Sequence, residues 1–307
     1  MMNPKIGVKI GSLALKNPVM VASGTFGYGE EFAGLCDLKK LGAIVTKTIT
    51  INPRQGNPVP RTCETPSGMI NSIGLENPGI ERFLSEKLPV VRKAGVPVIV
   101  SIASEGSLVE FVILAKRLDK IPGVAALELN ISCPNLKKKR LVAQDAAATA
   151  EVVRSVRKAT QKTIITKLSP NVTDIVEIAL AAQNAGSDAL ALINTVQAMA
   201  IDVKTREPKI AMASGGLSGP AIRPIAVRMV WEVYQKVKIP IIGMGGIMDT
   251  QSALEFLIAG ASAISVGTAN FIEPGISVEI IAGIKKYLAE NKISAIQKLI
   301  GLMECKK

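Results

Sequence analysis

One short segment combines a thiol with side-chain amides. Residues 130–135 read Asn-Ile-Ser-Cys-Pro-Asn and directly follow 124–129, an apolar run typical of a buried strand. The thiol of Cys133 can transfer a proton, and the flanking asparagine amides can donate and accept hydrogen bonds, which suits a flat, imide-like ligand. The chain contains no histidine, the usual general base. Cys133 is therefore the leading candidate for proton transfer, although a buried, inert thiol is the commoner use of cysteine.

The elements that would position this segment are short apolar runs that alternate with amphipathic segments. The runs are rich in Val and Ile and nearly continuous, as expected of parallel strands buried on both faces. They comprise residues 18–23, 43–48, 97–103, 125–131, 163–168, 189–194, 239–243 and 263–267. The amphipathic segments include residues 108–118, 147–159, 175–185 and 253–259. Eight strand–helix alternations in 307 residues predict an α/β fold, a (β/α)8 TIM barrel, with an open doubly wound sheet as the alternative.

Two long segments interrupt this alternation of strands and helices, one after the second and one after the sixth predicted strand. Residues 50–81 contain five prolines, and residues 195–220 form the second excursion. Ordered loops of this length are usually functional, and we expect the first to pass over the top of the barrel. No internal repeat, linker or low-complexity segment divides the chain, which predicts a single domain over residues 1–307.

Two lysines lie where an active site is expected, at the carboxyl ends of the barrel strands. Lys47 ends the second predicted strand and Lys167 lies in the fifth, so both would point inward and be partly buried. A buried ammonium group is costly unless it is paired. Its partner would be an anionic ligand or electron-rich cofactor ring, or else an Asp or Glu side chain that the sequence does not reveal.

Glycine-rich turns follow the seventh and eighth predicted strands. Residues 243–247 read Gly-Met-Gly-Gly-Ile, and Gly267 precedes Thr268 after the last run. Loops at these positions of a barrel often bind phosphate through backbone N–H groups. Taken singly, the glycines are explained equally well by tight turns. Together with a third glycine-rich stretch, 215–219, they favour a phosphate site.

The amino-acid composition limits which partners, metal sites and cellular compartments are compatible with the chain. The net charge of +12 is compatible with nucleic acid, an anionic ligand or an acidic partner, and a lysine-rich solvated surface is the simpler explanation. The cysteines form no Cys-x-x-Cys pair, which argues against a zinc ribbon or an iron–sulfur cluster in this chain. Without histidine, we expect no metal site. Scattered cysteines are typical of a reducing compartment, and no signal peptide or membrane span is evident, so we expect a cytoplasmic protein.

Several of these segments, taken together, resemble the class 1 dihydroorotate dehydrogenases, and most closely the catalytic subunit of class 1B. The stretches that carry the resemblance are 46–50, 68–75, 130–135, 167–171, 215–220 and 243–247. The resemblance implies a barrel that holds FMN and oxidises dihydroorotate to orotate in pyrimidine biosynthesis. Cys133 would take the proton from ring carbon 5, the hydride of ring carbon 6 would pass to the flavin, and Lys47 would lie between flavin and substrate.

The resemblance also implies two sets of binding residues. The substrate set is Lys47, Asn71, Ser72, Ile73, Gly74, Leu75, Asn130, Asn135, Asn194 and Thr195. The FMN set is Ala22, Ser23, Gly24, Lys47, Thr48, Ser101, Asn130, Lys167, Ile193, Gly219, Gly245, Gly246, Gly267 and Thr268. The chain departs from the family at two places. Residues 136–142 lack the glycines of the usual mobile lid, and Ser101 replaces a common flavin-facing asparagine, which would weaken FMN binding slightly.

Partners and alternatives follow from the same resemblance. Class 1B relatives pass electrons to NAD through a second subunit that bears FAD and a [2Fe–2S] cluster, and this chain has neither a dinucleotide fingerprint nor a cysteine cluster. We therefore expect a heterotetramer built on a homodimer of this chain, and we expect it to bind neither nucleic acid nor a membrane.

The sequence also bears on the alternatives. Residues 193–195, 201–202 and 243–247 favour class 1B over the fumarate-using class 1A. A tRNA dihydrouridine synthase-like enzyme and a catalytically impaired flavin-binding protein are further alternatives.

Overall fold

The computed structural model describes residues 3–132, 134–135 and 140–304. Its centre is a closed barrel in which every neighbouring pair of strands is parallel. Around the barrel the strands are β3 (Val19–Val21), β4 (Ala43–Val45), β7 (Val98–Ile102), β8 (Val124–Asn130), β11 (Thr163–Lys167), β12 (Ala189–Leu192), β17 (Ile241–Gly243) and β18 (Ala263–Val266). The predicted (β/α)8 barrel is confirmed, and the open sheet is excluded because β8 pairs with β11 and closes the ring.

The barrel strands are almost entirely buried because helices cover their outer surface. β3, β4, β7, β11, β12, β17 and β18 have no exposed residue. Their side chains are mostly Val, Ile, Leu and Ala, and a fully buried side chain of the larger types contributes roughly 1.5–3 kcal/mol. This aliphatic core explains how a chain with only 3% aromatic residues can support a barrel.

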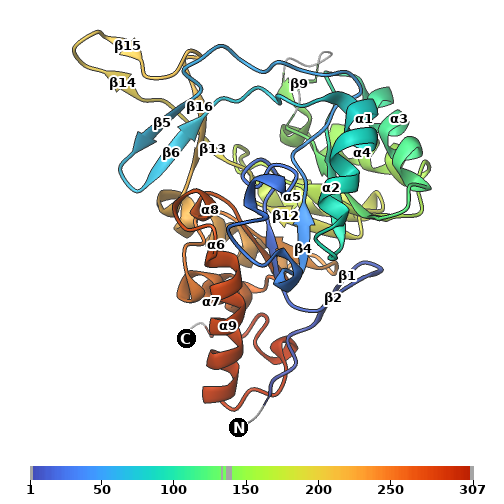
Figure 1. The fold of residues 1–307 in the computed structure, drawn as a ribbon, viewed down its shortest axis with the longest axis vertical. Helices are drawn as coiled ribbons and strands as arrows, with labels where there is room; N and C mark the ends of the chain where they lie inside the picture. Colours follow the sequence, from blue (N-terminus) through green and yellow to red (C-terminus); the bar gives the residue numbers. More distant parts are fainter. Residues whose placement is uncertain (1–2, 133, 136–139, 305–307) are drawn as a thin grey trace.

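Helices alternate with the strands around the barrel (Figure 1). The predicted amphipathic segments form α3 (Leu108–Asp119), α4 (Ala146–Arg157), α5 (Ile175–Asn184) and α7 (Thr250–Ala259). Each of the four begins behind a Ser or Asp that accepts a hydrogen bond from a first-turn N–H group, which stabilises the helix start. The remaining helices are α1 (Gly79–Arg82), α2 (Leu88–Arg92), α6 (Arg223–Tyr234), α8 (Ala269–Ile272) and α9 (Ile276–Glu290). Among the described residues, no helix combines the length and apolar character that a bilayer crossing requires.

The two excursions come together as one sheet beside the barrel (Figure 1, upper left). The first contributes β5 (Thr62–Thr65) and β6 (Gly68–Asn71), and the second contributes β13 (Val196–Ala198) and β16 (Gly215–Ser218). The antiparallel order is β13-β16-β6-β5, so β6 and β16 join the excursions. Three short hairpins complete the strands: β1 (Val8–Ile10) with β2 (Leu13–Leu15), β9 (Pro134–Asn135) with β10 (Arg140–Leu141), and β14 (Ile201–Asp202) with β15 (Glu207–Pro208).

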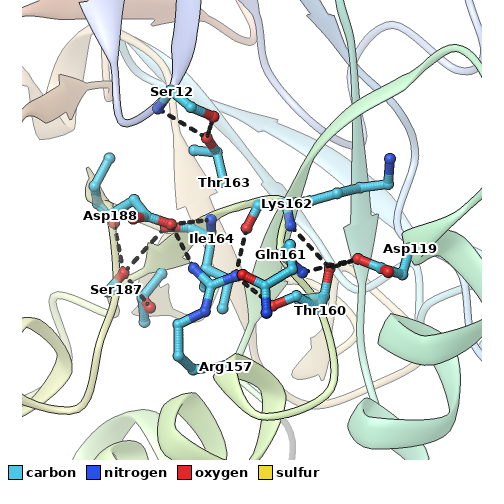
Figure 2. Close-up of polar contacts among 12 residues, drawn as sticks. Ser12, Asp119, Arg157, Thr160, Gln161, Lys162, Thr163, Ile164, Ser187 and Asp188 are labelled. Carbon is cyan, nitrogen blue, oxygen red and sulfur yellow. Dashed lines mark hydrogen bonds and ion pairs between the residues drawn. The ribbon is translucent and has the colours of Figure 1, made fainter.

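A polar network ties the amino-terminal ends of β11 and β12 to the end of α4 (Figure 2). Arg157 Nη1 lies 2.8 Å from Asp188 Oδ2, and Arg157 Nη2 donates to the carbonyl of Lys162 at 2.9 Å. Asp188 Oδ2 also accepts from the N–H of Ile164 at 2.8 Å. This face of a barrel usually contributes stability and not catalysis. The network therefore serves to hold the strands in place.

Removing the carboxylate of this network should lower stability and leave activity intact. We expect Asp188→Ala to reduce the free energy of unfolding by about 1–3 kcal/mol, because it strands a charged donor and a strand N–H group. Chemical denaturation measures the change. Glu86→Ala is the control, since the Arg82–Glu86 pair is exposed and of the kind that contributes only about 0.3–0.5 kcal/mol. Equal losses in the two variants would contradict a stabilising role for the network.

Candidate active site

A cavity of about 400 Å³ lies at the carboxyl ends of the barrel strands. Its size is within the range of roughly 300–1,000 Å³ that is typical of small-molecule sites. The barrel supplies most of the wall, and Thr62, Met69, Asn71 and Ser218 of the antiparallel sheet line it as well. The two excursions therefore help to enclose the same space that the strand ends define.

Most of the residues predicted from the sequence meet in this cavity. Those that line it are Ala22, Ser23, Gly24, Lys47, Thr48, Asn71, Ser72, Ile73, Gly74, Leu75, Asn130, Lys167, Ile193, Asn194, Thr195, Gly219, Gly245, Gly246, Gly267 and Thr268. Cys133 lies outside the described residues, as do residues 136–139 of the glycine-free segment 136–142. Asn135 is described only by its backbone in β9. The predicted roles of all these residues remain proposals, which we take up below.

Ser101 belongs to the predicted FMN set but does not line the cavity. It is fully buried, and its hydroxyl lies 2.9 Å from Thr48 Oγ1. Thr48 Oγ1 also lies 3.1 Å from Ser23 Oγ and accepts a hydrogen bond from Asn130 Nδ2 at 3.3 Å. The Ser101 hydroxyl therefore supports Thr48 from the side away from the cavity. This geometry does not favour a direct contact between Ser101 and a ligand.

Two lysines that face the cavity form no ion pair with any described residue. Lys47 is half-buried, Lys167 is buried, and both line the cavity. Within the part of the chain that the structure describes, neither ammonium group has a carboxylate within ion-pair distance. Desolvation lowers the pKa of Lys47, and the negative charge of Glu76 partly opposes this effect. The Asp or Glu partner considered above is thus not observed, which favours an anionic or electron-rich ligand.

Backbone N–H groups at the glycine-rich turns are also without acceptors. Among the described residues, no acceptor is found for the N–H groups of Gly245, Gly246 and Gly267. Gly245 and Gly246 have φ angles of 123° and 78°, which other residues rarely adopt. Ser265 lines the same cavity, and its Oγ is fully buried and has no hydrogen-bond partner among the described residues. These unsatisfied groups fit a ligand that brings a phosphate and further polar atoms.

A second set of N–H groups lies on the loop after β6. The N–H groups of Ile73, Gly74 and Leu75 have no acceptor among the described residues, and all three residues line the cavity. Gly74 and Leu75 both have positive φ angles, of 76° and 58°. Successive N–H groups in such a turn form a concave site for an anion. The loop can therefore hold a carboxylate beside Lys47.

Asn194 and Ser132 also line the cavity, and Asn194 Nδ2 donates to Ser132 Oγ at 2.9 Å. Asn194 Oδ1 accepts from the N–H of Thr195 at 2.8 Å, and Asn171 Nδ2 donates to the carbonyl of Thr195 at 3.1 Å. Ser132 therefore anchors the start of the cysteine loop to the end of β12. Ser132, the residue before Cys133, is thereby held at the cavity wall.

The sequence analysis missed several residues of the wall. These are Thr25, Thr62, Met69, Glu76, Ser132, Ser218, Ile222, Met244, Ile247, Met248, Ser265 and Phe271. Ser132 and Ser218 could have been found, because each is next to a residue that was singled out. Thr62 and Met69 depend on how the excursions fold back, for which the sequence carries no direct signal.

The fold and the cavity define a (β/α)8-barrel protein with a cavity at its strand ends that two lysines line. The family model for dihydroorotate dehydrogenase matches residues 5–288, and the chain belongs to that family. It is 54% identical over 305 residues to a protein of Geotalea daltonii, covering 99% of this chain and 100% of the relative. A protein of Desulforudis audaxviator is 55% identical over 301 residues, covering 98% of both chains. Both relatives are named dihydroorotate dehydrogenase B (NAD(+)), catalytic subunit.

The lowered pKa of Lys47 predicts a pH dependence of anion binding. As the pH rises through that pKa, Lys47 should lose its charge earlier than an exposed lysine does, so orotate should bind more weakly. We expect Lys47→Met to weaken orotate binding at neutral pH by about 10- to 100-fold, the range for a lost hydrogen bond to a charged group. The Lys47→Met substitution should also flatten the decline in orotate affinity at alkaline pH. Calorimetry in a Cys133→Ser background measures this without interference from the thiol. An unchanged decline in Lys47→Met would assign the titration to another group.

Proposed function

We propose that this chain is the catalytic subunit of an NAD-linked dihydroorotate dehydrogenase, which oxidises dihydroorotate to orotate in de novo pyrimidine biosynthesis. Membership of the dihydroorotate dehydrogenase family over residues 5–288, and the shared name of relatives that match nearly the whole chain, support this function. The observation that carries it is the cavity, which is lined by two lysines and two sets of backbone N–H groups that have no ion-pair partner or acceptor in the part of the chain that the structure describes.

FMN is the cofactor that we propose for the cavity, with residues 1–307 acting as one FMN-binding domain. The residues present fit it: the free N–H groups of Gly245, Gly246 and Gly267 suit its phosphate, and Lys167 suits an electron-rich ring. Bound FMN would accept the hydride from the substrate. Thr48, supported by Ser101, would contact the cofactor from the opposite wall.

We propose that the substrate binds between the cofactor and the loop after β6. The free N–H groups of Ile73, Gly74 and Leu75, together with Lys47, would hold the carboxylate. The amides that line the cavity match the alternating donors and acceptors of the pyrimidine ring. We assign the ring contacts to Asn71, Ser72, Asn130, Asn135, Asn194 and Thr195.

Cys133 is the residue that we propose as the base. The proton on ring carbon 5 is next to a carbonyl, so a thiol with an ordinary pKa of about 8.5 can remove it, whereas a serine hydroxyl is a far weaker acid. The described neighbours support the assignment, because Ser132 lines the cavity and is bonded to Asn194. The loop is thus tied to the wall one residue before the thiol.

The electrons must then leave the flavin. The relatives' name specifies a catalytic subunit and NAD, and this sequence has no dinucleotide fingerprint. We propose a cytoplasmic heterotetramer, in which a homodimer of this chain binds two partner subunits that carry FAD and a [2Fe–2S] cluster. The family assignment favours this function over a tRNA dihydrouridine synthase.

Turnover by the isolated chain tests this function. With dihydroorotate as the donor, we expect the chain to reduce an artificial dye but not NAD or fumarate, because the route to NAD lies in the partner. No turnover with the dye would favour the catalytically impaired alternative. Efficient reduction of fumarate would move the protein to class 1A.

The same assay tests the base. Cys133→Ser should slow flavin reduction by roughly 10²–10⁴-fold and regain some rate at high pH, while orotate and FMN still bind. An unchanged rate near neutral pH would assign proton removal to another residue.

A further inference from the structure

We propose that Asn57 is a positioning residue that sets the orientation of the carboxylate-binding loop, residues 72–75. The inference rests on the proposed function and names the residue that holds the carboxylate-binding loop in its conformation. Asn57 lies in the first excursion, is half-buried and does not line the cavity. Its side-chain Nδ2 donates to the carbonyl of Ser72 at 2.9 Å, and its own N–H donates to the carbonyl of Ile73 at 3.0 Å.

The carbonyls of this loop are all held on the side away from the free N–H groups. Besides the two bonds from Asn57, Arg54 Nε donates to the carbonyl of Gly74 at 3.4 Å. In a trans peptide, the C=O of one residue and the N–H of the next point in opposite directions. Fixing the carbonyls of Ser72, Ile73 and Gly74 therefore fixes the N–H groups of Ile73, Gly74 and Leu75. Within this loop, these are the N–H groups for which the described residues provide no acceptor.

Asn57 contributes two of these three anchors, and the packing around it is close. A Cβ atom on Gly74 would lie 2.6 Å from the backbone nitrogen and side chain of Asn57, and a Cβ atom on Gly56 would collide with the carbonyl of Ile73. On its other side, the carbonyl of Asn57 accepts a hydrogen bond from Arg61 Nε, and Arg61 is paired with Glu76. Arg61 thus holds the backbone of Asn57 in place, and Asn57 in turn holds the loop.

The alternative is that Asn57 only stabilises a turn in the first excursion. The two roles predict different kinetics. If Asn57 aims the N–H groups at a carboxylate that binds equally in the ground state and the transition state, its loss should raise KM and leave kcat nearly unchanged. A purely structural role would lower the melting temperature or the yield and would leave KM as it is.

The test compares Asn57→Asp with Gln55→Glu in the flavin-loaded protein. Both changes convert an amide into a carboxylate in the same segment. Gln55 is exposed, and its side chain has no hydrogen bond among the described residues, so it controls for the added charge. Asn57→Ala removes the donor without adding charge, and it also serves if Asn57→Asp does not fold. The measurements are the dissociation constant of orotate by calorimetry, and KM and kcat for dihydroorotate with a dye.

We expect Asn57→Asp to weaken orotate binding and to raise KM by about 10-fold, with Asn57→Ala showing a smaller shift in the same direction. For both, kcat and the FMN content should stay within about twofold of the wild type, because no transition-state contact is lost. Gln55→Glu should match the wild type. If the Asn57 variants match Gln55→Glu in both binding and KM, or lose kcat at constant KM, the positioning role is wrong while the proposed function stands. If the wild type neither binds orotate nor oxidises dihydroorotate, the proposed function fails and the inference fails with it.

Discussion

The cavity concentrates positive charge and backbone hydrogen-bond donors that form no ion pair and find no acceptor among the described residues. Lys47 and Lys167 face it without an ion-pair partner among the described residues, and free N–H groups approach it from Ile73–Leu75 and from Gly245 and Gly246. Such an arrangement is unfavourable unless anions complete it. A dianionic phosphate at one end and a carboxylate at the other would satisfy both sets, which is the charge pattern of FMN together with dihydroorotate.

The rest of the fold serves to hold these groups in place. The parallel strands fix the lysines and asparagines at one end of the barrel, while the network around Arg157 and Asp188 ties the opposite end together. Function and stability are therefore divided between the two faces, as is usual for this architecture. The antiparallel sheet adds a wall that the barrel alone does not have, and Asn57 in the same excursion supports the loop that follows β6.

The barrel could be predicted because its signal is local. Strands buried on both faces are continuous apolar runs, and helix starts are marked by residues such as Ser107 and Asp174. The strand-end residues followed directly, since Lys47, Asn130 and Lys167 stand at the ends of recognisable runs. The resemblance to a known family then suggested roles for them that composition and periodicity could not.

Pairing between distant segments was not predictable in the same way. Nothing in the polar, proline-rich first excursion indicates that β6 would pair with β16, or that Asn57 would bind the carbonyls of Ser72 and Ile73. These contacts depend on register between segments far apart in the chain, and no periodic pattern encodes it. The hydrogen bond between Ser101 and Thr48 was likewise not predictable, because it joins the ends of two different barrel strands.

The most direct test of this account is the cofactor content of the purified chain. Denaturation should release one FMN and no FAD per chain, and orotate should perturb the visible spectrum of the bound flavin, because we propose that both ligands bind in the same cavity. A folded, colourless chain that takes up no FMN, or one that releases FAD, would contradict the account.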